Sequence, residues 1–299
     1  MREAKAFAPG HLTGLFQICI DGDDPLKWGA RGSGVSITRG VLTSVSVEPS
    51  EQASHDIYIN YEHMIDAHVS ENVLSKYQRY ITEPVKIAIN HTIQTPITAG
   101  FGSSGGGALT LSLALNKVLE VGLTRIEAAQ IAHVAEIECK TGLGSVFAAN
   151  NGGFGVLYKP GAPGIGEGML MEETDDLAVV YVYYGPIHTK EALSNPELVK
   201  KINQLGGNYV DELHRELTPE RFMYYSRKFT DHIGLATPRI NELFKQMDDY
   251  DLTFTMANFG EVAFTVQYKE KAEESVEILQ KLGEDPIFCS VDKHGTVLL

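Results

Sequence analysis

The sequence predicts an α+β fold in two domains, with mixed sheets and flanking helices. Apolar and polar residues alternate at 41–47 and 85–90, as in half-buried strands, and residues 177–184 form a nearly continuous apolar segment typical of a fully buried strand. Apolar residues at helical spacing fill 109–121 and 126–139. Both kinds of element occur from the start of the chain, whose 299 residues suffice for one large or two closely packed domains.

The remaining elements follow in the same mixed order. Thr124 and Glu127 have the spacing of a capping box that begins the helix predicted at 126–139. Residues 159–168 are rich in glycine and proline and form the predicted connector, so we divide the chain into an N-terminal nucleotide-binding domain, residues 1–160, and a C-terminal domain, residues 161–299. Further helices are predicted at 197–205, 219–233, 238–247 and 269–282, and further strands at 262–268, 287–291 and 296–299.

Composition and charge exclude several classes of protein. The formal charge of −14 argues against nonspecific nucleic-acid binding, which needs clustered lysine and arginine. Cys19, Cys139 and Cys289 are isolated in the chain, so they support neither a disulfide framework nor a zinc site. No apolar leader begins the chain and no segment approaches 18 uninterrupted apolar residues, so we expect a cytoplasmic protein without a membrane partner. A monomer and a homodimer both stay open.

Residues 96–107 carry the strongest functional signal. They read P-I-T-A-G-F-G-S-S-G-G-G and run directly into a helical pattern. Glycine inside a helix costs about 1 kcal/mol relative to alanine, and close approach of the backbone to a ligand is the best reason for three in succession. The unpaired N–H groups that begin a helix suit a bound phosphate. The residues predicted to hold a nucleotide are Pro96, Gly100, Gly102, Ser103, Ser104, Gly105, Gly106 and Gly107.

Three alternative types of loop fit residues 96–107 less well. A Walker-type loop is excluded because no lysine follows the glycines. Gly100, Gly102 and Gly105 match the dinucleotide-binding fingerprint of a dehydrogenase, but a buried strand directly before the loop and an acidic strand end after it are both missing. A serine-capped turn before a core helix is the plain structural alternative, and five glycines within eight residues argue against it.

Three segments, taken in order along the chain, resemble the motifs of the GHMP kinases. Residues 96–105 resemble the phosphate loop P-x-x-x-G-L-G-S-S-[AG], with Phe101 in place of leucine. Residues 8–16, A-P-G-H-L-T-G-L-F, resemble the first motif, with His11 where many members have lysine, and residues 256–264 lie where the third motif belongs. The resemblance covers essentially the whole chain and implies the two-domain α+β fold, ATP as phosphoryl donor and Mg²⁺.

Finer features are similar to the archaeal pantoate kinase branch of that superfamily. These features are the first motif, the run D-P-L-K-W-G at 24–29 followed by G-S-G-V at 32–35, and T-G-L-G at 141–144. Members carry an aspartate after the last of these motifs as base or orienter, but this chain has Ser145. A serine can orient the acceptor hydroxyl and cannot act as a general base at neutral pH. His11 is the alternative proton acceptor or charge stabiliser, and a catalytically inactive nucleotide-binding relative stays open.

The resemblance also implies a metal site. Ser104 matches the family's Mg²⁺-binding serine, a role compatible with capping the helix. The other ligand is a glutamate near the end of the next long helix, where this chain offers Glu136 and Glu138. Side chains two residues apart on a helix point about 200° from one another, so only one can face the loop. The local pattern A-H-x-A-E at 132–136 favours Glu136.

The acceptor end departs from the pantoate kinase pattern. Ala30 stands where those enzymes tend to carry serine, and the segment after Gly152–Gly153 has Leu157 and its neighbours without an arginine. Arg31 adds a cation to a segment expected to line the acceptor pocket. The residues predicted to bind the acceptor are His11, Thr13, Ala30, Arg31, Ser145 and Asn258.

These features predict ATP-dependent phosphorylation of the primary hydroxyl of a small branched hydroxy acid. We favour mevalonate 3-phosphate, the acceptor of a 5-kinase in an archaeal variant of the mevalonate pathway of isoprenoid biosynthesis, because Arg31 could meet its second anion. The alternative is pantoate kinase, which forms 4-phosphopantoate for coenzyme A biosynthesis.

Overall fold

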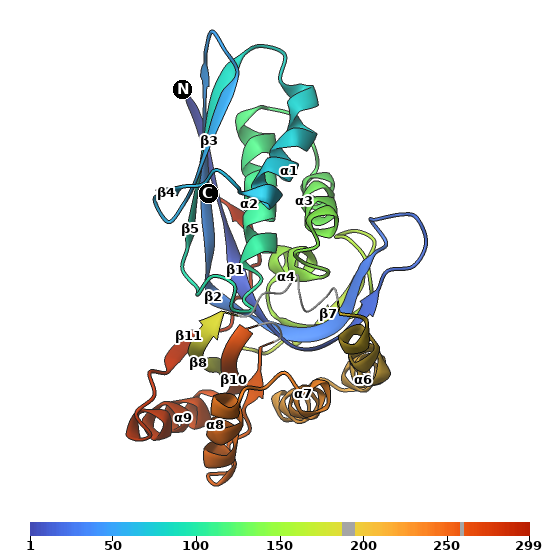
Figure 1. Ribbon diagram of the computed structural model, residues 1–299, viewed down its shortest axis with the longest axis vertical. Coiled ribbons are helices and arrows are strands. Elements are labelled where there is room, and N and C mark those ends of the chain that lie inside the picture. The colour runs from blue at the N-terminus through green and yellow to red at the C-terminus, as the bar shows by residue number, and fades with distance from the viewer. Residues whose placement is uncertain (187–194, 258–259) are drawn as a thin grey trace.

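Two β-sheets organise the computed structural model, which describes residues 1–186, 195–257 and 260–299 (Figure 1). The first sheet has the order β12-β1-β2-β5-β3-β4, and β6 and β7 extend it from one end of β2. Its strands are β1 (Arg2–Cys19), β2 (Gly29–Pro49), β3 (Ser54–Ile59), β4 (Glu62–His63), β5 (Val85–Ile93), β6 (Phe154–Lys159), β7 (Glu167–Leu170) and β12 (Val297–Leu298). The second sheet has the order β11 (Ile287–Ser290), β8 (Leu177–Pro186), β10 (Gly260–Tyr268) and β9 (Thr255–Met256).

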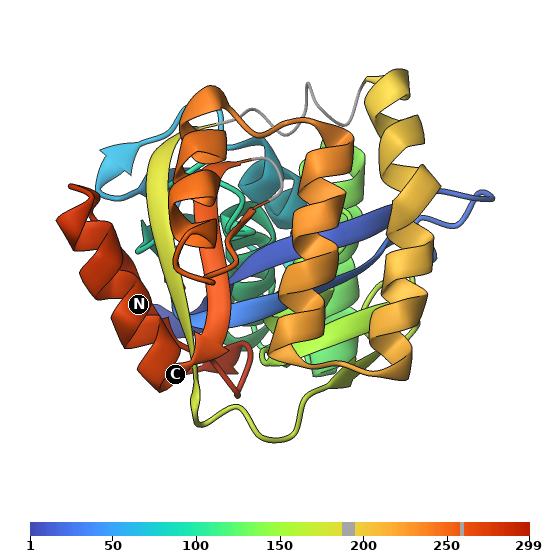
Figure 2. The same ribbon diagram turned by 90° about the horizontal axis from the view of Figure 1, so that it is seen from below.

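Two sets of helices pack on these sheets. The first set lies against one face of the first sheet and consists of α1 (His68–Tyr77), α2 (Ser103–Val118), α3 (Arg125–Cys139) and α4 (Ser145–Asn151), with a 3₁₀ turn at Gln78–Tyr80 (Figure 1). The second set is α6 (Pro196–Arg215), α7 (Pro219–Ile233), α8 (Pro238–Asp248) and α9 (Lys269–Lys281). Figure 2 shows α6 and α7 side by side across the long strands β1 and β2. The predicted α+β class with mixed sheets is confirmed. No described helix has the length and apolarity needed to cross a bilayer.

The strands β1 and β2 are much longer than the sequence indicates. The alternating pattern predicts only 41–47 of β2, and the first motif at 8–16 lies inside β1. Alanine, glycine and proline supply much of this part of β1, and the pairing of β1 with β2 shifts register after Pro9 and again after Thr13. Small residues and register shifts interrupt the alternation by which strands are predicted, so the pattern misses most of both strands.

Helix α2 begins six residues earlier than the apolar pattern predicts, at Ser103, so the three consecutive glycines lie within it. Two of these glycines permit close contacts. A Cβ built on Gly105 would lie 2.6 Å from Ser145 Cβ, and one on Gly106 would lie 3.5 Å from Ala8 Cβ. The glycines therefore bring α2 close to β1 and α4 at the phosphate loop.

The predicted connector at 159–168 joins two paired strands of the same sheet. β6 and β7 are antiparallel neighbours, and the chain passes from the first sheet to the second after β7, between Leu170 and Leu177. The last strand, β12, returns to the first sheet and pairs with β1. The division of the chain at residue 160 stays a prediction.

Helix α6 packs directly on the backbone of β1. The side chain of Asn203 accepts a hydrogen bond from the Ile18 N–H at 2.8 Å and donates one to the Ile18 carbonyl at 3.1 Å. One turn later Gly206 is buried, and a Cβ built on it would lie 2.0 Å from the Phe16 carbonyl oxygen. Glycine is needed there because the helix and the strand backbone touch.

We expect Gly206→Ala to lower the free energy of unfolding by about 2 kcal/mol or more, because the new methyl overlaps a strand backbone that cannot move freely. Gly207→Ala is the matched control, since its nearest neighbour is the mobile side-chain end of Gln17 at 2.9 Å. Urea denaturation of both variants measures the effect. Equal stability of the two variants would contradict the close packing of α6 on β1.

Candidate active site

A cavity of about 960 Å³ lies where the start of α2 faces β1, β2 and the segment 141–170. Figure 1 shows β2 curving beneath α4 and towards β7 at this place. Of the predicted nucleotide-binding residues, Gly100, Gly102, Ser103, Ser104 and Gly107 line the cavity. Pro96, Gly105 and Gly106 are not among its lining residues. The two glycines pack against protein instead, Gly105 against Ser145 and Gly106 against Ala8 and Val41.

The phosphate loop has the backbone conformation that its glycines predict. Gly100 and Gly102 have φ of 80° and 65°, in the left-handed region that favours glycine, and Gly102 caps α2. The Ser103 and Thr95 hydroxyls lie 3.1 Å apart. The His11 N–H donates to the Phe101 carbonyl at 2.9 Å, which joins the first motif to this loop.

The carboxylate of Glu136 lies at the centre of the site and is 1% exposed. It accepts hydrogen bonds from three hydroxyls: Ser104 Oγ, Thr141 Oγ1 at 2.6 Å and Ser145 Oγ at 2.9 Å. Burial raises the pKa of Glu136, and the three hydroxyl donors partly oppose that rise. The structure therefore brings together Ser104, Glu136 and Ser145, which the sequence predicts as site residues.

Thr141 is a contact that the sequence reasoning missed. Lys140 ends α3 in the left-handed conformation, with φ of 57°, and turns the chain back so that the Thr141 N–H bonds to the Glu136 carbonyl. This turn places a hydroxyl five residues after Glu136 beside its carboxylate. The position of a threonine directly after the helix was visible in the sequence. The direction of its side chain depends on the left-handed turn at Lys140, which the sequence did not reveal.

The residues around Glu136 fit a divalent metal ion with oxygen ligands. No lysine or arginine among the described residues pairs with this buried carboxylate, so a bound cation would supply the missing charge. The described chain holds no cluster of three or more histidine, cysteine or acidic side chains that could form a complete metal cage. Magnesium suits such a site because it commonly takes one or two carboxylates and completes its shell with water and substrate phosphates.

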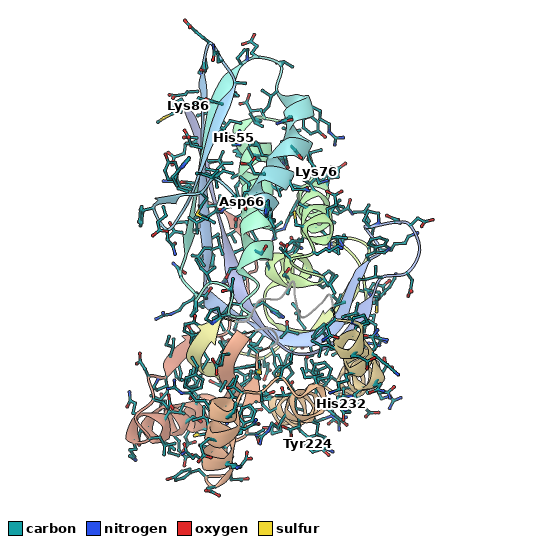
Figure 3. All side chains as sticks on the ribbon, in the orientation of Figure 1. His55, Asp66, Lys76, Lys86, Tyr224 and His232 are labelled. Carbon is teal, nitrogen blue, oxygen red and sulfur yellow. The ribbon has the colours of Figure 1, made fainter. Side chains whose placement is uncertain are left out.

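Glu138, the alternative metal ligand, faces away from the loop. Its carboxylate lies 2.7 Å from Lys76 Nζ, the ammonium of a lysine labelled on α1 in Figure 3, and 3.0 Å from Asn72 Nδ2. Two residues along α3 thus separate a buried carboxylate at the loop from a surface ion pair. The geometry agrees with helical spacing, by which only one of the two side chains can face the loop, and with the local pattern at 132–136, which favours Glu136.

His11 lies in the cavity wall as a neutral imidazole. Its Nδ1 is 3.1 Å from Ser36 Oγ, and a Cβ built on Gly34 would lie 2.4 Å from its Nε2, so the glycine makes room for the ring. Burial lowers the pKa of His11 to about 4. The ring is therefore neutral and does not carry a fixed positive charge at neutral pH, and the same low pKa makes it a weak base in the ligand-free protein. Thr13, which pairs with Gly34 across the two strands, lines the same cavity.

Arg31 does not reach the cavity, which differs from the sequence prediction. It lies in strand β2, where successive side chains point to opposite faces, and Ala30 and Gly32 occupy the cavity side. The guanidinium instead donates to Gln17 Oε1 at 3.1 Å and forms an ion pair with Asp211 of α6. No lysine or arginine is among the described residues that line the cavity. Asn258 lies outside the described residues.

Comparison with known proteins agrees with this architecture. Residues 67–153 match the family model described as the GHMP kinases N terminal domain. The pantoate kinase of Methanocaldococcus jannaschii is 33% identical over 290 residues, which are 95% of this chain and 99% of that protein. The pantoate kinase of Thermococcus kodakarensis is 32% identical over 290 residues, covering 93% of this chain and 92% of that protein.

A solved structure extends the agreement to the fold. A protein described as a phosphotransferase related to the CoA biosynthesis pathway superposes with a TM-score of 0.90 at 29% identity, covering 99% of this chain and 98% of that chain. GHMP kinases use ATP and generally a divalent metal ion. The chain belongs to the GHMP kinase family, in its archaeal pantoate kinase-like branch, and is a small-molecule kinase.

Proposed function

We propose that this chain is a pantoate kinase, which transfers the γ-phosphoryl group of ATP to the primary hydroxyl of pantoate and forms 4-phosphopantoate. The observation that carries the proposal is similarity along nearly the whole chain to relatives with that activity in their names. The cavity supports it, since a glycine loop, a buried carboxylate and a neutral imidazole face one space. Phosphoryl transfer needs mainly positioning and charge neutralisation from a protein.

The prediction of mevalonate 3-phosphate as acceptor is wrong. Three relatives at 28–33% identity are pantoate kinases, and the structural relative is a phosphotransferase of CoA biosynthesis. The physical basis of the prediction also fails. Arg31 was expected to bind the phosphate of mevalonate 3-phosphate, but its guanidinium forms an ion pair with Asp211. The assignments to the mevalonate pathway and isoprenoid biosynthesis fall with it.

In this proposal the phosphate loop and α2 hold the nucleotide. Backbone N–H groups at the start of α2 would bind the phosphates, and Ser104 Oγ and the Glu136 carboxylate would hold Mg²⁺. The ion would neutralise phosphate charge during transfer. Ser145 and Thr141 keep the carboxylate in place through the hydrogen bonds that they donate to it.

The acceptor enters between Ser145 and His11 in the same proposal. The Ser145 hydroxyl donates its own hydrogen to Glu136, so it would orient the acceptor alcohol by accepting a hydrogen bond from it. As the phosphoryl group is transferred, the alcohol would release this proton to the neutral His11 ring. No arginine or lysine among the described lining residues is available for the carboxylate of pantoate. Hydroxyl and backbone donors of the cavity wall are therefore the groups proposed to bind it, with Thr13 among them.

We expect the purified protein to release ADP with pantoate and Mg²⁺, with a kcat/KM at least tenfold above that for mevalonate, mevalonate 3-phosphate, mevalonate 5-phosphate or homoserine. A coupled ADP-release assay measures this, and ³¹P NMR identifies the product. ATP binding without turnover of pantoate would contradict the proposal and favour a catalytically inactive relative.

We expect Glu136→Gln to lower kcat by about a hundredfold or more, because the neutral amide cannot balance the charge of the metal ion. Glu138→Gln is the matched control on the same helix, and its loss of a surface ion pair should change kcat by less than about fivefold. Steady-state kinetics at saturating ATP compares them. A larger loss in the Glu138 variant would move the metal site to the surface carboxylate.

Glu136→Gln should also change how stability depends on pH in the absence of metal and nucleotide. Folding raises the pKa of Glu136 above its usual 4.5, so the carboxyl ionises more readily in the unfolded chain. The wild type therefore loses stability as the pH rises from 4.5 through the pKa of the folded state. The variant lacks this loss, so its stability relative to the wild type should increase from about pH 4.5 to about pH 8. Urea denaturation at the two pH values tests it, and a constant difference would contradict the buried carboxyl.

We expect the His11 ring to stay neutral in the ligand-free protein until the pH falls well below the usual imidazole pKa of 6.5, since burial lowers its pKa to about 4. Titration of the imidazole nitrogen resonances by NMR, assigned with His11→Gln, measures this pKa. An ionisation near 6.5 would contradict the effect of burial on the pKa of this ring.

A further inference from the structure

Three residues from different segments meet on the cavity wall next to Ser145. A Cβ built on Gly144 would lie 3.8 Å from Ala30 Cβ and 3.8 Å from Leu157 Cδ2, and these are the atoms within 4 Å of it. Both distances are ordinary van der Waals contacts between carbon atoms. The position beside Gly144, which we call the methyl niche, therefore accepts one methyl group in van der Waals contact with side-chain carbon of Ala30 and Leu157.

Backbone contacts hold the walls of the methyl niche in place. The Ala30 N–H donates to the Leu143 carbonyl at 3.1 Å, which fixes β2 against the residue before Gly144. Leu157 of β6 pairs with Gly32 of β2, so the two strands keep a constant separation. All three niche residues line the cavity, and Ala30 is only 8% exposed.

The methyl niche adjoins the hydroxyl cluster on which phosphoryl transfer depends. Gly144 directly precedes Ser145, whose hydroxyl bonds to Glu136, and Glu136 accepts from Ser104 at the phosphate loop. With the acceptor alcohol at Ser145, as proposed above, the carbon adjacent to its CH2OH carbon would reach Gly144, the residue directly before Ser145. Any group on that carbon which enters the niche meets carbon, so a methyl group gains contacts and a hydroxyl would lose its hydrogen bonds to water.

We propose that Ala30, Gly144 and Leu157 select the acceptor by binding a methyl group on the carbon adjacent to its CH2OH carbon. This inference rests on the proposed function, since pantoate carries two methyl groups on that carbon. The niche holds one of them beside Gly144. Branching of this carbon is then a requirement of the site, read by contact with Ala30 and Leu157.

The test compares pantoate with 2,4-dihydroxybutanoate, which has the same hydroxyls and carboxylate but no methyl groups. The wild type should prefer pantoate by about tenfold or more in kcat/KM, the usual effect of a missing methyl group in a fitted apolar pocket. Gly144→Ala places a methyl in the niche itself. The substitution is compatible with the fold, because its contacts are ordinary and φ of Gly144 is −146°.

Gly144→Ala should lower kcat/KM for pantoate at least tenfold more than for 2,4-dihydroxybutanoate. Leu157→Ala removes one wall of the niche and should bring the kcat/KM values of the two acceptors closer together. Leu170→Ala is the matched control, because Leu170 lines the same cavity beside Gly153 and Gly155 and does not contact the methyl niche. This variant should leave the ratio of kcat/KM for pantoate to that for 2,4-dihydroxybutanoate unchanged within about twofold. Thermal unfolding of each variant establishes that it is folded.

The outcomes separate the two proposals. If the wild type does not phosphorylate pantoate, the proposed function fails and the niche fails with it. If the wild type turns over pantoate but the ratio between the two acceptors is the same in Gly144→Ala, Leu157→Ala and the wild type, the proposed function stands and the niche is overturned. A wild type that uses both acceptors equally also overturns the niche.

Discussion

The buried carboxylate of Glu136 ties together three segments that reach the cavity from different directions. Ser104 lies in the first turn of α2, Thr141 follows the end of α3, and Ser145 begins α4. The hydroxyls of Ser104 and Thr141 donate to Oε1 of the carboxylate, and the hydroxyl of Ser145 donates to Oε2. A carboxylate without a cation is unstable in such surroundings unless hydrogen bonds or a metal ion compensate its burial. This one interaction therefore fixes the starts of α2 and α4 and the end of α3 relative to one another.

Close packing around α2 makes that interaction possible. The phosphate loop can meet Glu136 only if α2 lies near β1 and α4, and Gly105 and Gly106 remove the side chains that would separate them. The same glycines explain why residues 103–107 were predicted to touch a ligand, since close approach to protein and close approach to phosphate both require a missing Cβ. Gly107 lines the cavity, whereas Gly105 and Gly106 pack against other parts of the protein.

The acceptor side of the cavity is defined by neutral and apolar groups. Alternation along β2 directs Ala30 into the cavity and Arg31 towards Asp211, so adjacent residues in the chain have opposite surroundings. The sequence prediction placed both residues in the pocket because it did not recognise their segment as part of a strand. Once the segment is a strand, a charged residue there can pair with α6, and the cavity keeps a small apolar surface beside Gly144.

The sequence by itself determined the α+β class, the phosphate loop and the family, because these depend on residues that are contiguous or regularly spaced in the chain. Helical spacing also separated Glu136 from Glu138, and the capping box at Thr124 and Glu127 forms as predicted. Only the tertiary structure decided the direction of Arg31, the contact of Thr141 with Glu136 and the meeting of Ala30, Gly144 and Leu157. Each depends on strand direction or on contacts between segments far apart in the chain, and no local pattern of residues specifies these.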